Sequence, residues 1–143
     1  MREKEHFRLE LTVRDEDVDM LDHASNIAFV RWIQDVAIAH SAAVGLDFDA
    51  YRRLGGVFVV VRHEVDYVRP ALRGDVVEAR TWIESAMIAK VLRSTELIRV
   101  SDGQLLAKAL TTWGYVGFAT GRPTRIREEV RQAFAPYVHA SVT

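Results

Sequence analysis

The sequence has no cysteine and no long apolar run, and each absence narrows what the protein can be. Without cysteine, the 143-residue chain has no disulfide, no thiol nucleophile and no cysteine-ligated metal, so we expect a cytoplasmic protein. The longest apolar run, 57–61, is too short to cross a bilayer, and no apolar stretch of signal-peptide length follows the charged start. We therefore expect a soluble protein that does not associate with membranes.

An excess of charge of either sign is also missing. The 19 Lys and Arg are balanced by 20 Asp and Glu, which gives a net charge of −1. Because no overall field attracts polyanions, we expect no nucleic-acid partner, and any contact with phosphates must be local. The length and the 49% apolar content fit a single domain over residues 1–143 with a substantial core.

One long helical segment, from Ile27 to Val44, is the centre of the predicted fold. Its polar side chains fall within one narrow arc of the helix: Arg31, Gln34 and Asp35. Apolar residues occupy most of the remaining circumference, so we expect other elements to wrap this helix. Asp22 or Asp19 is the predicted N-cap, and Gly45 is the predicted residue just after its end.

The remaining chain is dominated by strand patterns, in which apolar and polar residues alternate or β-branched residues cluster. Five strands are predicted, over residues 7–13, 57–68, 76–83, 91–100 and 105–118. A helical turn is expected within 46–54, and Ile126, Val130 and Phe134 share one face of a short C-terminal helix. The order strand, long helix, four strands predicts an α+β protein in which one face of an antiparallel sheet covers the helix.

The later strands carry more aromatic surface than one helix can bury. These aromatic residues are Trp82, Trp113, Tyr115 and Phe118. Since exposed aromatic patches and open sheet edges favour association, we expect a homo-oligomer.

The segment before the helix holds five carboxylates: Asp15, Glu16, Asp17, Asp19 and Asp22. One interpretation is a solvated loop that supplies one N-cap. A calcium loop does not fit, because Met20 and Asn26 stand where that loop needs glycine and glutamate, and we expect no metal. The chemical interpretation groups Asp19, His23 and Asn26 at the helix start, suited to general-base or nucleophilic attack on a carbonyl whose oxygen rests on helix N–H groups.

Basic residues gather near the start of a later strand, where Lys90 and Arg93 are followed by Arg99 and Lys108. The structural interpretation is a solvated strand edge, and the functional interpretation is a local phosphate-binding site. The other histidines, including His40 and His63, are expected to be ordinary polar residues.

The pattern Asp17-x-Asp19-x-x-x-His23-x-x-Asn26, leading into Phe29, Arg31 and Trp32, resembles the acyl-CoA thioesterases of the 4-hydroxybenzoyl-CoA type. The similarity continues through 65–70, 73–75 and 120–123, so it covers nearly the whole chain. The resemblance implies a hot-dog fold, in which an antiparallel sheet wraps one long central helix. It also implies a homodimer or tetramer formed by sheets joined side by side.

This resemblance implies a thioester hydrolase that converts an acyl-CoA or acyl carrier protein thioester to the free acid. Asp19 would be the nucleophile or general base, His23 and Asn26 would orient or line the site, and the helix N-terminus near His23 and Ala24 would polarise the carbonyl. Lys90 and Arg93 would hold the phosphates. No cofactor is implied, since coenzyme A is part of the substrate. The alternative function is a non-catalytic acyl-thioester-binding protein.

The sequence departs from the family pattern at Asp22, where the family usually has glycine. A carboxylate here would either cap the helix and compete with the substrate oxygen, or oppose the ionisation of Asp19 through like-charge repulsion.

Overall fold

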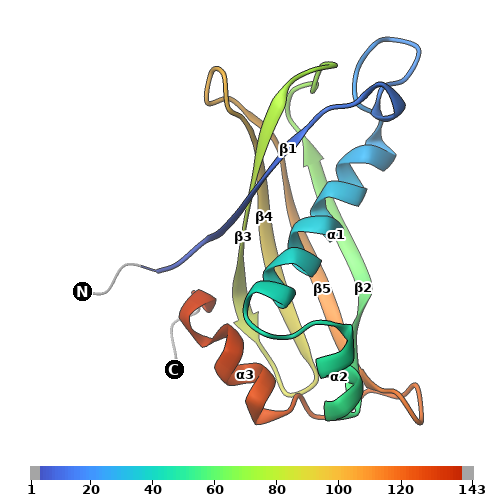
Figure 1. Cartoon of the computed structure of the whole chain (residues 1–143), viewed down its shortest axis with the longest axis vertical. Coiled ribbons are helices and arrows are strands. Elements are labelled where there is room, and N and C mark those ends of the chain that lie inside the picture. Colours follow the sequence, from blue (N-terminus) through green and yellow to red (C-terminus); the bar gives the residue numbers. More distant parts are fainter. Residues whose placement is uncertain (1–3, 140–143) are drawn as a thin grey trace.

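The computed structural model describes residues 4–139, which form one sheet and three α-helices (Figure 1). In chain order the elements are β1 (Phe7–Thr12), the 3₁₀ turn η1 (Asp15–Asp17), α1 (Asn26–Ala43), α2 (Phe48–Leu54), β2 (Gly56–Tyr67), β3 (Val76–Ala86), β4 (Lys90–Arg99), β5 (Leu105–Gly117), α3 (Glu128–Phe134) and the 3₁₀ turn η2 (Ala135–Tyr137). The five predicted strands, the short helical turn and the C-terminal helix are confirmed, with boundaries within a few residues.

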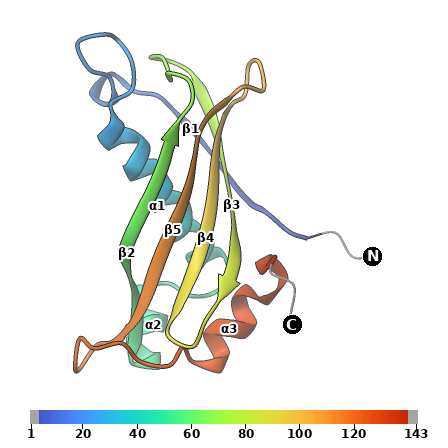
Figure 2. The ribbon, with the colours of Figure 1, turned by 180° about the vertical axis from the view of Figure 1, so that it is seen from behind.

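The sheet has the strand order β1-β3-β4-β5-β2, and every neighbouring pair is antiparallel. Helix α1 lies across one face of this sheet, and α2 and α3 sit at one end of it (Figure 1). The opposite face is open, as the view from behind shows (Figure 2). The alternation along β3 and β4 matches this arrangement, because the residues facing α1 are buried and those between them are only half-buried.

Helix α1 begins at Asn26 because Ser25 caps it: the Ser25 hydroxyl accepts the N–H of Ala28 at 3.1 Å. The prediction that Asp19 or Asp22 is the N-cap is therefore wrong. The prediction for Gly45 is confirmed, since it follows the C-cap with φ +89°, a conformation that glycine adopts without strain.

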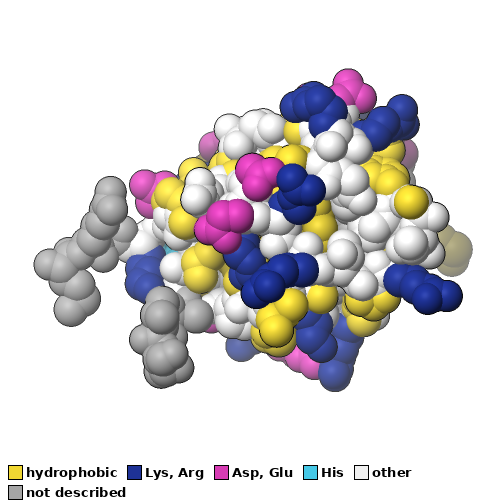
Figure 3. Space-filling view, turned by 90° about the horizontal axis from the view of Figure 1, so that it is seen from below, with side chains coloured by type: hydrophobic (Ala, Val, Ile, Leu, Met, Phe, Trp, Pro, Cys, Tyr) yellow, Lys and Arg dark blue, Asp and Glu magenta, His cyan; other side chains and the backbone are white. Residues whose placement is uncertain are grey.

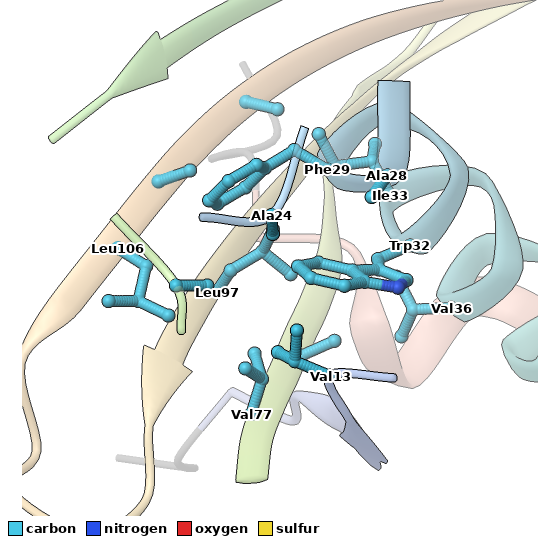
Figure 4. Close-up of a cluster of buried hydrophobic side chains, with 14 residues drawn as sticks. Val13, Ala24, Ala28, Phe29, Trp32, Ile33, Val36, Val77, Leu97 and Leu106 are labelled. Atoms are coloured by element: carbon cyan, nitrogen blue, oxygen red, sulfur yellow. The ribbon is translucent and has the colours of Figure 1, made fainter. Parts of the chain in front are cut away.

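The helix is also less enclosed than its apolar circumference predicted. The sheet buries one side of it, but Ile27 is 79% exposed and Ile38 is 63% exposed. The core against the sheet is in two parts. The first lies under the N-terminal half of α1, where Phe29, Trp32 and Ile33 pack on residues of β3, β4 and β5 (Figure 4).

The second cluster lies beyond the C-terminal half of α1 and joins α2, α3 and the sheet. It includes Tyr115, which is 1% exposed, with Trp113 packed against it. Tyr115 is thus covered by the chain's own short helices, whereas Trp113 is half-buried and Phe118 is 40% exposed. The argument from surplus aromatics therefore does not apply to Tyr115, and self-association stays a prediction.

None of the helices within residues 4–139 is both long and apolar enough to cross a membrane. Residues 1–3 of the charged start lie outside the described part of the chain.

Candidate active site

The acidic segment between η1 and α1 folds into a closed loop directly before the helix. Val18 and Ala24 pair as an antiparallel bridge, and His23 forms another such bridge with Leu72. The N–H of Asp19 donates to the carbonyl of His23 at 2.8 Å. The backbone of the loop is therefore fixed both to itself and to the segment that enters β3.

Asp17 anchors the loop to the helix. Its side chain is 3% exposed, accepts the N–H of Arg14 at 2.9 Å and forms an ion pair with Arg31. Its carbonyl accepts the N–H of the capping residue Ser25 at 2.8 Å. A buried carboxylate that is both paired and hydrogen-bonded has a fixed position. The first aspartate of the motif therefore has a structural role.

Asp22 has a backbone conformation that glycine adopts without strain, which accounts for the glycine that the resemblance led us to expect here. Its φ of +65° makes it the one non-glycine residue with positive φ within the described chain, and its N–H donates to the carbonyl of Asp19 at 3.0 Å. Its carboxylate pairs with Arg73 at 2.7 Å, and the same guanidinium holds Asp15 at 2.7 Å. These contacts raise the pKa of Arg73, with Asp22 the main cause.

Asp19 itself is exposed at the rim of the loop. Its Oδ1 accepts the N–H of Leu21 at 2.9 Å, while no described residue donates to its Oδ2. The tip residues Met20 and Leu21 extend into solvent, at 102% and 74% exposure. One oxygen of the Asp19 carboxylate is thus oriented by the turn, and the other is available to a ligand.

His23 and Asn26 flank the same loop: His23 is half-buried at its end, and Asn26 is the exposed first residue of α1. The loop and the helix start therefore bring the three predicted residues to one end of the molecule. Within residues 4–139 no hydrogen bond joins their side chains, so they do not form a pre-assembled triad.

The helix start offers backbone donors beside this loop. The N–H of Ala24 is already bonded to the carbonyl of Ala71 at 2.8 Å, and the Ser25 hydroxyl takes the N–H of Ala28. Asn26 and Ile27 donate their N–H groups to no described residue. The N–H of His23 likewise has no acceptor among the described residues, so the donors available at this positive helix end are those of His23, Asn26 and Ile27, while that of Ala24 is occupied.

The two basic residues predicted to hold phosphates have different surroundings. Lys90 is exposed at the start of β4. Arg93 is 4% exposed, and its Nη1 donates to His40 Nδ1 at 2.9 Å and to Thr81 Oγ1 at 3.0 Å. Placing Arg93 at a solvated strand edge was wrong, because it is on the strand face that points under α1. Its contact with phosphate stays a prediction.

His40 is fully buried, in contrast to the ordinary polar role that was expected. Burial lowers its pKa to about 3, and the positive charge of Arg93 contributes. Desolvation likewise lowers the pKa of Arg93 to about 10. Neutral His40 therefore accepts the Arg93 hydrogen bond and contributes no charge.

Sequence reasoning missed two polar pairs: the buried Asp17 with the half-exposed Arg31, and the buried His40 with the buried Arg93. The sequence did contain a signal for the first pair, since Arg31 lies in the polar arc of the helix that follows the five carboxylates. The sequence signal for the pair of His40 and Arg93 was weaker: His40 interrupts the apolar arc of α1, and Arg93 takes an inward-facing position in β4. Among residues 4–139, no three His, Asp or Glu side chains are placed to hold a metal ion.

A family model for the thioesterase-like superfamily matches residues 13–134. The chain belongs to this superfamily. The match includes the closed loop, α1 and the whole sheet except β1.

Curated relatives in this superfamily include plant acyl carrier protein thioesterases. A chloroplastic acyl-[acyl-carrier-protein] hydrolase of Cuphea viscosissima is 24% identical over 137 residues, which are 92% of this chain and 33% of that protein. A chloroplastic palmitoyl-acyl carrier protein thioesterase of Arabidopsis thaliana is 27% identical with the same coverage. The chain thus spans about one third of the length of these relatives.

Solved structures that resemble this chain show that its arrangement of strands and helices is the hot-dog fold. A 1,4-dihydroxy-2-naphthoyl-CoA thioesterase from Synechocystis superposes with a TM-score of 0.83 at 18% identity, covering 92% of this chain and 96% of that one. A Staphylococcus aureus protein solved in complex with CoA superposes with a TM-score of 0.88 at 19% identity, covering 96% of this chain and 86% of that one. The predicted α+β hot-dog fold is confirmed.

Proposed function

We propose that this protein hydrolyses acyl thioesters at the closed loop before α1. The observation that supports it best is the position of Asp19, which is held on a fixed loop before a helix start where the N–H groups of Asn26 and Ile27 have no partner among residues 4–139. A carboxylate and two oriented donors at one place are what attack on a carbonyl requires.

In this proposal the thioester carbonyl oxygen lies on the free amides of the helix start. As the carbonyl carbon is attacked, negative charge develops on that oxygen, and the positive end of the helix stabilises it. Asp19 acts either as the nucleophile, forming an acyl-enzyme anhydride that water cleaves, or as the base that activates water. The products are the free acid and the thiol, and His23 and Asn26 line the site.

The proposed substrate class is an acyl-CoA or an acyl carrier protein thioester. Support comes from the relatives, which act on acyl carrier protein thioesters by name, and from the structural neighbour solved with CoA. Lys90 is the proposed phosphate contact, because it is exposed and cationic. Since such a contact is remote from the reacting carbonyl, Lys90→Ala should raise KM and leave kcat nearly unchanged.

We also propose that the active form is a homodimer joined along β2. This strand is an edge of the sheet, and Val59 and Val61 on it are 42% and 66% exposed. An edge with apolar side chains and unpaired backbone groups is suited to pairing with a second copy.

The decisive test is Asp19→Asn, assayed on a panel of acyl-CoA substrates with a thiol reagent. The amide keeps the shape and the loop hydrogen bond but can act neither as base nor as nucleophile, so kcat/KM should fall at least about 10²-fold with an unchanged melting temperature. The matched control is Asp15→Asn, on an exposed side chain of the same segment. If Asp19→Asn turned over substrate as fast as the wild type, the assignment of Asp19 as nucleophile or base would be wrong. Tight binding of a thioester by a wild type without turnover would support the non-catalytic alternative.

A further inference from the structure

A large cavity opens at the other end of α1 from Asp19. It has a volume of about 880 Å³ and is lined by residues of α1, α2, α3 and the sheet, among them Ser41, Tyr51, Ile83, Trp113 and Phe134. From Asn26 to Ser41 the helix rises about 20 Å, so this cavity is separate from the loop of the same chain. Its size is in the range of small-molecule pockets, which hold about 300–1,000 Å³.

The walls of the cavity are mainly apolar, and one fully charged side chain is buried in them. Arg93 is 4% exposed and lines the cavity from β4. All its hydrogen bonds to described residues come from Nη1, and its Nε is buried without a partner. Nε and Nη2 of this cavity-lining guanidinium thus have no hydrogen-bond partner among the described residues.

No carboxylate of the described residues neutralises this guanidinium. Its partners are a threonine hydroxyl and His40, which is neutral because burial lowers its pKa to about 3. Asp47 lines the same cavity, but it is exposed, and its Oδ1 caps α2 by accepting the N–H of Ala50 at 2.8 Å. A buried charge without a counter-ion is unfavourable, and an anion that enters the cavity would relieve this.

Nearby polar groups do not compete for that anion. The Ser41 hydroxyl donates to the carbonyl of Leu46 at 2.7 Å and lies 2.6 Å from the hydroxyl of Tyr51. The pKa of Tyr51 is raised by burial, so its hydroxyl stays protonated. Arg93 is therefore the buried cation of the cavity and lies beside neutral hydroxyls, while the other charged lining residues, Asp47 and Arg131, are less buried and hydrogen-bonded to backbone groups.

We propose that this cavity binds a carboxylic acid with an apolar body, with its carboxylate on Arg93 and its chain along the apolar walls. Figure 3 shows this end of the molecule, where Lys and Arg side chains, together with a few Asp and Glu, stand among hydrophobic ones. Basic residues at this end include Arg52, Arg125 and Arg131, which favour the approach of an anion. Free carboxylic acids are also the products of the proposed thioester hydrolysis, but binding on Arg93 requires neither a thioester nor Asp19 and is tested independently of turnover.

The test is calorimetric titration of the full chain with decanoate, 1-decanol and decyltrimethylammonium, which share one alkyl chain and differ in head group. Decanoate should bind at least about tenfold more tightly than 1-decanol, since a hydrogen bond to a charged group is stronger than one to a neutral group, and the cation should not bind. Equal binding of decanoate and 1-decanol would overturn the proposal, because the cavity would then recognise only the chain.

Variants locate the carboxylate. Arg93→Met should abolish the preference for decanoate over 1-decanol, and Arg93→Lys should restore part of it. Arg131→Met is the matched control, because Arg131 lines the same cavity but donates to the carbonyls of Met87 and Ile88. Loss of the preference in Arg131→Met but not in Arg93→Lys would place the carboxylate at the rim and overturn the proposal. If Arg93→Met does not fold, the proposal is still tested by the binding of decanoate and 1-decanol to the wild type and to Arg93→Lys.

Discussion

At the scale of single residues, Asp22 combines a backbone constraint with a charge. Both functions that the sequence suggested for its carboxylate depended on its facing the helix start or Asp19, but the side chain pairs with Arg73 and the helix is capped by Ser25. The position favours glycine because of φ +65°, and aspartate is among the residues that tolerate this conformation.

Two substitutions separate the backbone effect of Asp22 from its charge. Asp22→Gly and Asp22→Ala both remove the carboxylate, but only alanine keeps a Cβ at positive φ. We expect the glycine variant to be more stable than the alanine variant by about 1 kcal/mol in denaturant unfolding. Equal free energies of unfolding would show that the loop relaxes to negative φ. A shift of the acidic limb of the kcat/KM profile in both variants would show that the charge of Asp22 acts on Asp19.

His40 makes stability depend on pH in a predictable direction. Its pKa is about 3 in the folded protein against 6.5 for the free side chain, so the unfolded chain binds more protons between these values. The contribution of His40 to the free energy of unfolding is therefore complete above pH 6.5 and is lost as pH falls toward 3. Its size is on the order of a few kcal/mol.

The measurement is denaturant unfolding of wild type and His40→Gln between pH 7 and pH 4. Glutamine keeps an acceptor for Arg93 but does not titrate. The stability of the variant should fall less on acidification than that of the wild type, whatever its value at pH 7. Parallel curves for the two proteins would contradict the burial of a neutral imidazole.

At the scale of elements, the loop before α1 depends on Asp17. Asparagine at this position keeps an acceptor for the N–H of Arg14 but loses the ion pair with Arg31. We expect Asp17→Asn to lower the free energy of unfolding by about 1–3 kcal/mol and to reduce kcat/KM, since the loop that carries Asp19 loosens. Asp15→Asn, on a side chain that is 84% exposed, should change neither the free energy of unfolding nor kcat/KM. An Asp17→Asn variant with wild-type stability and turnover would show that Ser25 alone fixes the loop.

The elements themselves could be predicted because their patterns are local. Alternation along 7–13 and 105–118 and the helical period of 27–44 depend only on neighbouring residues, and the structure follows them. The start of α1 could not be predicted as well, because three residues that can act as N-cap precede it: Asp19, Asp22 and Ser25. The choice of Ser25 depends on the bridge between Val18 and Ala24, which is a contact within the folded loop.

The candidate site was predicted in part, for a related reason. The motif indicated the segment that holds Asp19, His23 and Asn26, and the structure brings these three to one end of the molecule. It did not distinguish the buried Asp17 from the exposed Asp19. Nor did it place Arg93 inside the protein, because the direction of a strand side chain depends on the register with β3 and β5.

At the scale of the whole molecule, the proposed dimer can be tested on the free edge of β2. Val61→Lys places a charge on an apolar side chain that is 66% exposed, and we expect sedimentation equilibrium to show a monomer with reduced activity. Val100→Lys is the control, since Val100 is 47% exposed next to the end of β4, away from this edge. A Val61→Lys variant that stays dimeric would exclude this edge as the interface.

The division of the core into two clusters also has a consequence for motion. The cluster under the N-terminal half of α1 is closely packed, whereas the second cluster surrounds a cavity of about 880 Å³ and is covered by two helices of seven residues each. Short helices beside empty volume have few contacts to lose when they open. Amide hydrogens of α2, α3 and the last turns of α1 should therefore exchange with solvent faster than those around Trp32. The protein would then be rigid where Asp19 is held and pliable about 20 Å further along the same helix.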